Sequence, residues 1–146
     1  MPKNKTAKIK WEGNGLAFTA TGGSGFSLRF NNPSGPGGGS PMEVVAMAAG
    51  GCTAADVLDI LRKKRQNVTG FEVNVVAVRA PQHPMVYTEI DLEYVVRGHN
   101  IDPKAIERSI ELSLTKYCSV RNTLNRSVKI NSRYRIEEEE MEAVAA

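Results

Sequence analysis

The chain has 146 residues, of which 41% are hydrophobic and 24% are charged, a balance typical of globular proteins and unlike that of disordered chains. The net charge of +3 is too small to predict nucleic-acid binding by itself. The most apolar stretch, residues 44–61, contains two glycines and two aspartates, and no apolar segment follows the basic N-terminus. We therefore expect a single cytoplasmic domain over 1–146 that binds neither nucleic acid nor membrane and carries no secretory signal.

The first thirty residues predict three short strands joined by tight turns. Polar and apolar side chains alternate over residues 5–11, and the turn Gly13-Asn14-Gly15 allows residues 16–20 to return as the second strand of a hairpin. Phe26, Leu28 and Phe30 alternate in the same way and predict a third strand. Glycine and proline then dominate residues 31–40. This composition predicts a flexible loop, because glycine increases backbone entropy and proline lacks a hydrogen-bond donor.

A long helix is predicted from Pro41 to about Gln66. Ser40 is placed to cap its N-terminus, and Glu43 follows three residues later, as in a capping box. Most of the first five turns are apolar on more than one side, which is typical of a helix that is buried all round. Because a chain of this length has little material to enclose such a helix, we expect an oligomer.

The second half of the chain predicts two long strands, a helix and a last strand. Alternating apolar residues indicate antiparallel strands over 71–80 and 86–97, after a turn at 67–70. Asp102-Pro103 predicts a helix start, with helical spacing to about Thr115 and a short helical segment at 122–126. A strand is expected over 127–136, followed by an acidic tail over 137–146. The element order β-β-β-α-β-β-α-β indicates an α+β fold.

The two cysteines, Cys52 and Cys118, are too few for a disulfide scaffold or for a zinc site made of cysteine pairs. They are 66 positions apart, so only the fold can bring them together. The two cysteines have two possible roles: they are either small buried apolar residues or a redox pair. Gly50 and Gly51 precede Cys52 inside the helix, where each costs about 1 kcal/mol relative to alanine. This cost indicates either close packing or a functional constraint next to the thiol.

Two carboxylates on the same helix are candidates to act on Cys52. Asp56 lies one turn later and about 40° around the helix, so it shares the face of Cys52. It opposes thiolate formation unless a cation compensates, and a structural hydrogen bond is the alternative role. Glu43 lies about 180° away on an ideal helix and approaches the thiol only if the glycine pair bulges. The two histidines, His83 and His99, lack the spacing of metal ligands, and we expect no metal site.

Three motifs in order resemble the OsmC/Ohr superfamily over nearly the whole chain. The central helix of that superfamily is similar to SPMEVVAMAAGGCTAADVLDIL (40–61), and its mid-sheet connection is similar to RAPQHPMVYTEI (79–90). The second-cysteine motif is similar to LSLTKYCSV (112–120). The resemblance implies an intertwined homodimer with a long buried central helix, and thiol-dependent reduction of organic hydroperoxides in oxidative-stress defence.

By this resemblance, Cys52 is the peroxidatic cysteine and Cys118 is the resolving cysteine. An external thiol or dithiol reduces the resulting disulfide, and no metal, flavin or haem cofactor takes part. The pattern is closest to a less characterised OsmC-like branch. The acid that directly follows the helix-opening proline in the well-characterised peroxidases is Met42 here, and Glu43 comes one residue later. Glu43 is therefore the candidate that orients the site.

The resemblance also implies an activating arginine in the N-terminal strands, yet the chain has no arginine between residues 3 and 25. Arg29, Lys8 and Lys10 are the candidates for that role. The alternative function is a non-catalytic dimer that binds an apolar small molecule, with cysteines that are structural or act as slow redox sensors. A purely structural dimer without a ligand is the third hypothesis. The reactivity of the Cys52 thiol distinguishes the peroxidase from the non-catalytic binding dimer.

Overall fold

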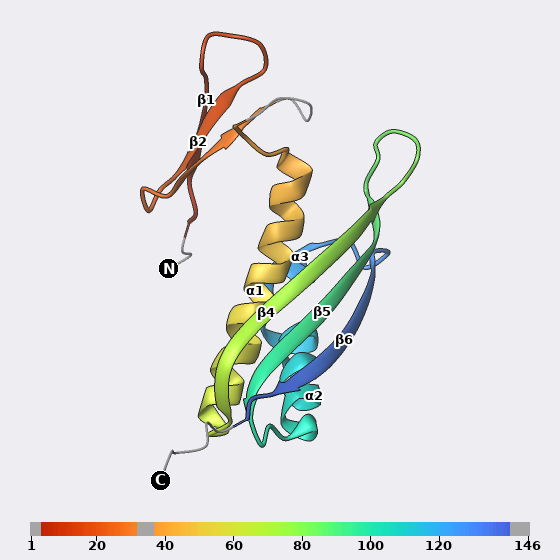
Figure 1. The fold of residues 1–146 in the computed structure, drawn as a ribbon. Helices are drawn as coiled ribbons and strands as arrows, with labels where there is room; N and C mark the ends of the chain where they lie inside the picture. The colour runs from red at the N-terminus through yellow and green to blue at the C-terminus, as the bar shows by residue number, and fades with distance from the viewer. Residues whose placement is uncertain (1–3, 32–36, 141–146) are drawn as a thin grey trace. The chain divides into compact units, whose positions relative to one another are not determined.

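The computed structural model describes residues 4–31 and 37–140. Their contacts divide the chain into two compact units, residues 1–45 and 46–146. Each unit contains one three-stranded sheet, β1-β2-β3 in the first and β4-β5-β6 in the second (Figure 1). The chain therefore has the predicted α+β class and the predicted order of its main elements.

In the N-terminal unit the predicted strands are confirmed with small shifts of their ends. Strands β1 (Ala7–Trp11), β2 (Phe18–Gly22) and β3 (Ser27–Phe30) form an antiparallel meander. Arg29 forms an ion pair with Glu12 at 3.0 Å and also donates to the Gly37 carbonyl. Part of the predicted loop is held in place, because the Gly39 amide donates to the Arg29 carbonyl at 3.2 Å. Residues 32–36 of that loop lie outside the described residues.

Helix α1 (Pro41–Lys63) begins where the sequence predicts. The Ser40 hydroxyl accepts a hydrogen bond from the Glu43 amide at 3.2 Å, which confirms the N-cap. The helix ends at Lys63, before the predicted Gln66, because Arg65 has the left-handed φ of 58° that closes helices. Its length and mean hydropathy of 1.6 over one 18-residue window also fit a membrane span.

Burial of α1 is one-sided in the single chain. The fully buried side chains recur every four residues along one stripe: Ala49, Thr53, Val57 and Leu61. Other apolar residues of the helix are exposed, and Met47 keeps 68% of its surface in solvent. The expectation of all-round burial is therefore not met within one chain.

The C-terminal sheet consists of β4 (Asn67–Arg79), β5 (Tyr87–His99) and β6 (Lys129–Glu138). Strands β4 and β5 are antiparallel as predicted, and β6 pairs with β5 in parallel. The turn predicted at 67–70 is wrong, because β4 already begins at Asn67. The last strand extends two residues into the predicted acidic tail, where Glu137 pairs with Arg97 at 2.6 Å. Residues 141–146 of the tail lie outside the described residues.

One face of this sheet forms the core. The inward side chains of β5 are completely buried or nearly so, and those of β4 are half-buried against them, as the alternation predicts: Ile90, Leu92, Tyr94 and Val96 of β5, and Phe71, Val73, Val75 and Ala77 of β4. Helix α2 (Pro103–Leu112) adds Ala105, Ile106 and Ile110 to the same cluster as Val57 and Leu61 of α1. The opposite face is polar around Glu93, which pairs with Arg133 at 3.1 Å.

The chain after α2 differs from the predicted helix end. A π-helical turn, η1 (Ser113–Tyr117), follows α2 directly, and the short helix α3 (Ser119–Thr123) comes next. The short helical segment therefore lies three residues earlier than the predicted 122–126. Turns of the π type widen the helix and are frequent at functional sites.

The two glycines before Cys52 are predicted to respond differently to alanine. A Cβ atom at Gly50 would lie 2.7 Å from Cγ2 of Val75, whereas a Cβ at Gly51 meets nothing within 4 Å. We expect Gly50→Ala to lower the free energy of unfolding by about 1 kcal/mol, because overpacking outweighs the gain in helix propensity. Gly51→Ala is the matched control and gains the propensity without the clash. Urea unfolding measures both, and a Gly50→Ala variant as stable as Gly51→Ala would contradict the packing explanation.

Candidate functional site

The two thiols, distant in sequence, lie next to each other in the C-terminal unit. Cys52 is in the middle of α1 and half-buried, whereas Cys118 lies between η1 and α3 and is completely buried. Both are free thiols. Their Sγ atoms and a carboxylate oxygen of Asp56 all lie within 4.8 Å of one another. The fold thus brings together both predicted redox cysteines and the carboxylate that the helix spacing placed on the Cys52 face.

Backbone hydrogen bonds hold Cys118 in position. Its amide donates to the Ser113 carbonyl at 2.7 Å, across the π-helical turn. Cys118 is also the N-cap of α3, where its Sγ accepts the Arg121 amide at 3.4 Å. The side-chain amide of Asn122 donates to the Cys118 carbonyl at 2.8 Å. Because Cys118 directly follows the last residue of η1, the π turn sets the position of the buried sulfur.

The environment of Cys118 favours its protonated form. Burial, with smaller contributions from the neighbouring Cys52 and Asp56, raises the pKa of this thiol from 9.0 to about 11, against the hydrogen bond from the Arg121 amide. No basic side chain is among the groups that shift this pKa in the described part of the chain. Cys118 is therefore a thiol, and not a thiolate, at neutral pH.

A chain of buried hydroxyls leads from the core to Asp56. Ser113 Oγ donates to Asp56 Oδ2 at 2.9 Å. Because this bond uses the only hydroxyl proton of Ser113, Thr53 must donate to Ser113 over 2.8 Å. Tyr94 must in turn donate to Thr53 over 2.7 Å. All three hydroxyls therefore donate in the direction of the Asp56 carboxylate, which is the last acceptor of this hydrogen-bonded series and lies beside the two sulfurs.

Sequence reasoning missed Thr53 and Ser113 as parts of this site. Thr53 lies in the part of α1 that was predicted to be buried on all sides, and it is buried in the structure. A hydroxyl at such a position needs a buried partner, and this requirement was the available signal. The alternation of β5 also predicted that Tyr94 points inward. Ser113 carried no comparable signal, since its position depends on the π-helical turn.

Raised pKa values predict a loss of stability in alkali. Below pH 9 the protonated Cys118 thiol contributes fully, and this contribution is lost as the pH rises through about 11. At pH 10 we expect a loss of about 1 kcal/mol from this group. Burial also raises the pKa of Tyr94 to about 12, which extends the loss above pH 10.

The reduced protein and Cys118→Ala should be unfolded in urea at several values between pH 7 and pH 10.5. The wild type should lose stability more steeply above pH 9, since the variant lacks the contribution of the Cys118 thiol. If the free energy of unfolding falls equally with pH in the two proteins, the loss of stability in alkali does not come from Cys118.

The remaining predicted site residues lie in the N-terminal unit. Glu43 is exposed in the first turn of α1, and α1 continues as a regular α-helix through the glycine pair, without the bulge that the prediction required. Its role stays a prediction. The guanidinium of Arg29 is bound to Glu12 and to the Gly37 carbonyl. Lys8 and Lys10 are exposed on β1, and their roles also stay predictions.

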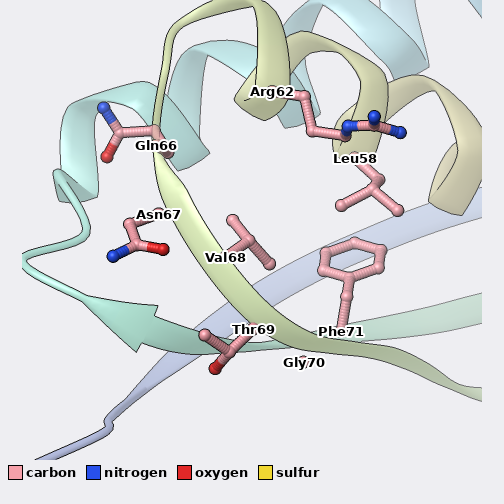
Figure 2. Close-up of a pocket in the computed structure, with 8 residues that line it drawn as sticks. All are labelled: Leu58, Arg62, Gln66, Asn67, Val68, Thr69, Gly70 and Phe71. Carbon is pink, nitrogen blue, oxygen red and sulfur yellow. The ribbon is translucent and has the colours of Figure 1, made fainter. Parts of the chain in front are cut away.

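Two hollows of the C-terminal unit differ in the residues that line them. A groove of about 420 Å³ lies beside the thiol cluster, with Asp56, Ile60, Leu112 and Tyr117 in its lining. A second cavity of about 560 Å³ lies between the end of α1 and the start of β4, where Leu58 and Phe71 are apolar and Arg62 is charged (Figure 2). Neither lining contains a cysteine, but only the groove contains Asp56, whose carboxylate lies within 4.8 Å of both sulfurs, so the groove is the hollow next to the thiols.

Comparisons with known proteins agree on one family. The family model described as OsmC-like protein matches residues 34–133. The Escherichia coli K12 protein YhfA is 40% identical over 130 residues, which cover 89% of this chain and 96% of YhfA. A crystal structure of a hypothetical protein from Aquifex aeolicus VF5 superposes with a TM-score of 0.84 and 28% identity, covering 95% of this chain and 100% of that chain.

A third similar structure is the organic hydroperoxide resistance protein OhrB of Bacillus subtilis. It superposes with a TM-score of 0.62 and covers 91% of this chain and 98% of its own. The two sequences are 13% identical, so this likeness concerns the fold alone.

Proposed function

The chain belongs to the OsmC-like protein family, and from this premise we propose that it reduces organic hydroperoxides with Cys52 and Cys118 as its redox pair. The observation that carries the proposal is the approach of the two Sγ atoms within 4.8 Å. The fold shared with a protein named for organic hydroperoxide resistance supports the choice of substrate class.

The proposed reaction begins at Cys52. Its thiolate attacks the terminal oxygen of the hydroperoxide, the O–O bond breaks, and the alcohol leaves with a proton, so that Cys52 becomes a sulfenic acid. The Cys118 sulfur then attacks the Cys52 sulfur. The disulfide forms, and the sulfenic oxygen leaves as water with the Cys118 proton. An external thiol or dithiol reduces the disulfide by exchange, and the cycle needs no metal, flavin or haem.

Burial and charge support this division of roles. Cys52 is the half-exposed thiol, so a peroxide reaches it without opening the core. Cys118 is completely buried, and its raised pKa of about 11 keeps it protonated until a sulfenic acid forms beside it. The two sulfurs must close from within 4.8 Å to the disulfide distance of about 2.05 Å.

A homodimer is part of the proposal, with a central helix that both copies enclose. Large apolar side chains are exposed in each unit, including Trp11 at 56%, Phe26 at 67% and Met47 at 68%. Exposed apolar surface of this kind is typical of a protein interface. Light scattering on the purified protein should give twice the mass of one chain. We also place the protein in the cytoplasm, where reduced thiol pools can restore the pair.

The direct test is a stopped-flow reaction of the reduced protein with an alkyl hydroperoxide. The proposal expects oxidation much faster than that of free cysteine, and faster with the alkyl hydroperoxide than with hydrogen peroxide, because the groove lining includes Ile60, Leu112 and Tyr117. Oxidation no faster than that of free cysteine would overturn the peroxidase proposal.

One observation favours the alternative function, the binding of an apolar small molecule. The groove beside the thiols has the apolar side chains of Ile60, Leu112 and Tyr117 in its lining, which would receive an apolar molecule. Slow oxidation combined with saturable binding of an apolar fluorescent probe would support this alternative. Fast oxidation that the probe does not inhibit would exclude it.

A further inference from the structure

Three acidic ligand groups converge at one point of the C-terminal unit. The Sγ atoms of Cys52 and Cys118 and a carboxylate oxygen of Asp56 lie within 4.8 Å of one another. Two thiolates and a carboxylate at this separation would repel one another. A cation at the centre of the three groups would remove the repulsion.

We propose that the reduced protein binds a thiophilic divalent cation of the Zn²⁺ type through Cys52, Asp56 and Cys118. Binding does not depend on the proposed function, but its regulatory consequence, given below, rests on that function. Thiolate and carboxylate ligands are both found in zinc sites, and a bound cation deprotonates a coordinating thiol. The fourth position would hold water, as in zinc sites that keep one position open.

The helical geometry favours this set of ligands. Cys52 and Asp56 are four residues apart on α1, the same spacing with which two histidines on one helix face bind zinc. Cys118 adds the third ligand from the end of the π-helical turn. Bonds of about 2.3 Å from zinc to two sulfurs in a tetrahedron place those sulfurs roughly 3.8 Å apart. The two sulfurs therefore need to approach each other by about 1 Å at most.

The groups around the ligands are already arranged as in a metal site. Ser113 donates to Asp56 Oδ2 at 2.9 Å, which leaves the other carboxylate oxygen for the cation. The Arg121 amide donates to Cys118 Sγ at 3.4 Å, a bond that also stabilises a thiolate. Such outer hydrogen bonds orient metal ligands and tune their affinity. Access is available along the groove of about 420 Å³, whose lining includes Asp56.

The consequence for the proposed redox cycle is mutual exclusion between metal and peroxide. A cation on Cys52 occupies the sulfur lone pair that would attack the hydroperoxide. When the metal-bound dithiolate is nonetheless oxidised, one hydroperoxide and two protons give the disulfide, one alcohol, one water and the free cation. Each sulfur loses one electron, and the O–O bond accepts the pair. Oxidation therefore releases the metal.

The test uses the full chain, reduced and metal-free under anaerobic conditions, and titrates it with Co²⁺. We expect a sulfur-to-cobalt charge-transfer band in the near ultraviolet, intense tetrahedral d–d bands, and loss of both on addition of one equivalent of Zn²⁺. Competition with a chromogenic chelator gives the zinc affinity. Because no peroxide is present, metal binding and peroxidase activity can fail independently.

Four variants identify the ligands. Cys52→Ser and Cys118→Ser should each weaken the charge-transfer band by about half or lose it, since each removes one of two sulfur ligands. Asp56→Asn should keep the band but weaken zinc binding at least about 10-fold. Glu111→Gln is the matched control, because this exposed carboxylate of α2 pairs with Arg108 and should leave binding unchanged.

The disulfide form made with one equivalent of alkyl hydroperoxide should bind no cobalt. The absence of a charge-transfer band in the folded reduced wild type would overturn the proposal. Zinc affinity equal to that of a folded Cys52→Ser, Cys118→Ser double variant would overturn it as well, and would indicate adventitious surface binding only.

Discussion

Replacement of Cys52 with serine is expected to lower the rate of alkyl hydroperoxide reduction by a factor of at least about 10³. A serine hydroxyl is not ionised at neutral pH, and its oxygen is a far weaker nucleophile toward peroxide than a thiolate. The remaining thiol, Cys118, cannot substitute, because it is completely buried and its pKa is raised to about 11. Peroxide consumption measured by stopped flow, with the wild type and the variant both reduced beforehand, checks this result.

Cys118→Ser is the matched variant, and its expected defect is different. Cys52 should still be oxidised at a rate close to that of the wild type, because its attack on the peroxide does not require the second thiol. The reaction should stop at the sulfenic acid, which dimedone traps and mass spectrometry detects. If Cys118→Ser instead loses the first oxidation while Cys52→Ser keeps it, the two roles are reversed.

Thr53→Val is expected to lower the free energy of unfolding by about 2–3 kcal/mol at neutral pH. Valine has nearly the shape of threonine but lacks the hydroxyl that joins Tyr94 to Ser113. The phenol of Tyr94 is completely buried, so the substitution leaves a polar group without its hydrogen-bond partner. Loss of that partner accounts for most of the expected effect.

Tyr94→Phe is the control that makes this prediction specific. It removes the phenol itself, and Thr53 can still donate to Ser113, so the expected loss is only about 1 kcal/mol. The double variant should be more stable than Thr53→Val alone, because no orphaned hydroxyl remains. Urea unfolding of the four proteins completes the cycle. If the two single variants lose the same free energy of unfolding, and the double variant loses the sum of the two, the hydrogen-bonded hydroxyls do not act as a unit.

Local patterns predicted the elements that local interactions determine. The side-chain alternation identified the inward faces of β4 and β5, where Val75 pairs with Leu92 in the core. Ser40 and Asp102 were recognised as helix caps because a cap needs only the amides of the next turn. The helix spacing also placed Asp56 on the face of Cys52, and the structure groups both with Cys118.

The missed features depend on contacts between distant segments. No local signal distinguishes a parallel β6 from an antiparallel one, since its direction follows from how the chain returns after α3. The π-helical turn that positions Cys118 has no sequence signature in Ser113–Tyr117. The all-round apolar surface of α1 was read correctly from composition, yet one chain buries only a single stripe of it. The remaining surface is what we propose a second copy covers.

The separation of the thiols could not be predicted, because it is set jointly by α1 and η1. Resemblance to the OsmC/Ohr superfamily supplied the expectation that Cys52 and Cys118 act together, and the fold then gave it a geometry. The residue that activates Cys52 does not follow from the geometry of the C-terminal unit. Arg29 is bound to Glu12 within the N-terminal unit, and Glu43 is exposed there. Their roles depend on how the units and chains assemble.

The most direct test of the thiol pair is to treat reduced protein with one equivalent of alkyl hydroperoxide and map the product by non-reducing peptide mass spectrometry. Mixing isotopically labelled and unlabelled chains separates bonds within a chain from bonds between chains. Two thiols should disappear for each peroxide, and Cys52 should be linked to Cys118 of the same chain. Two thiols left intact, or a Cys52–Cys52 bond between chains as the main product, would contradict this pairing.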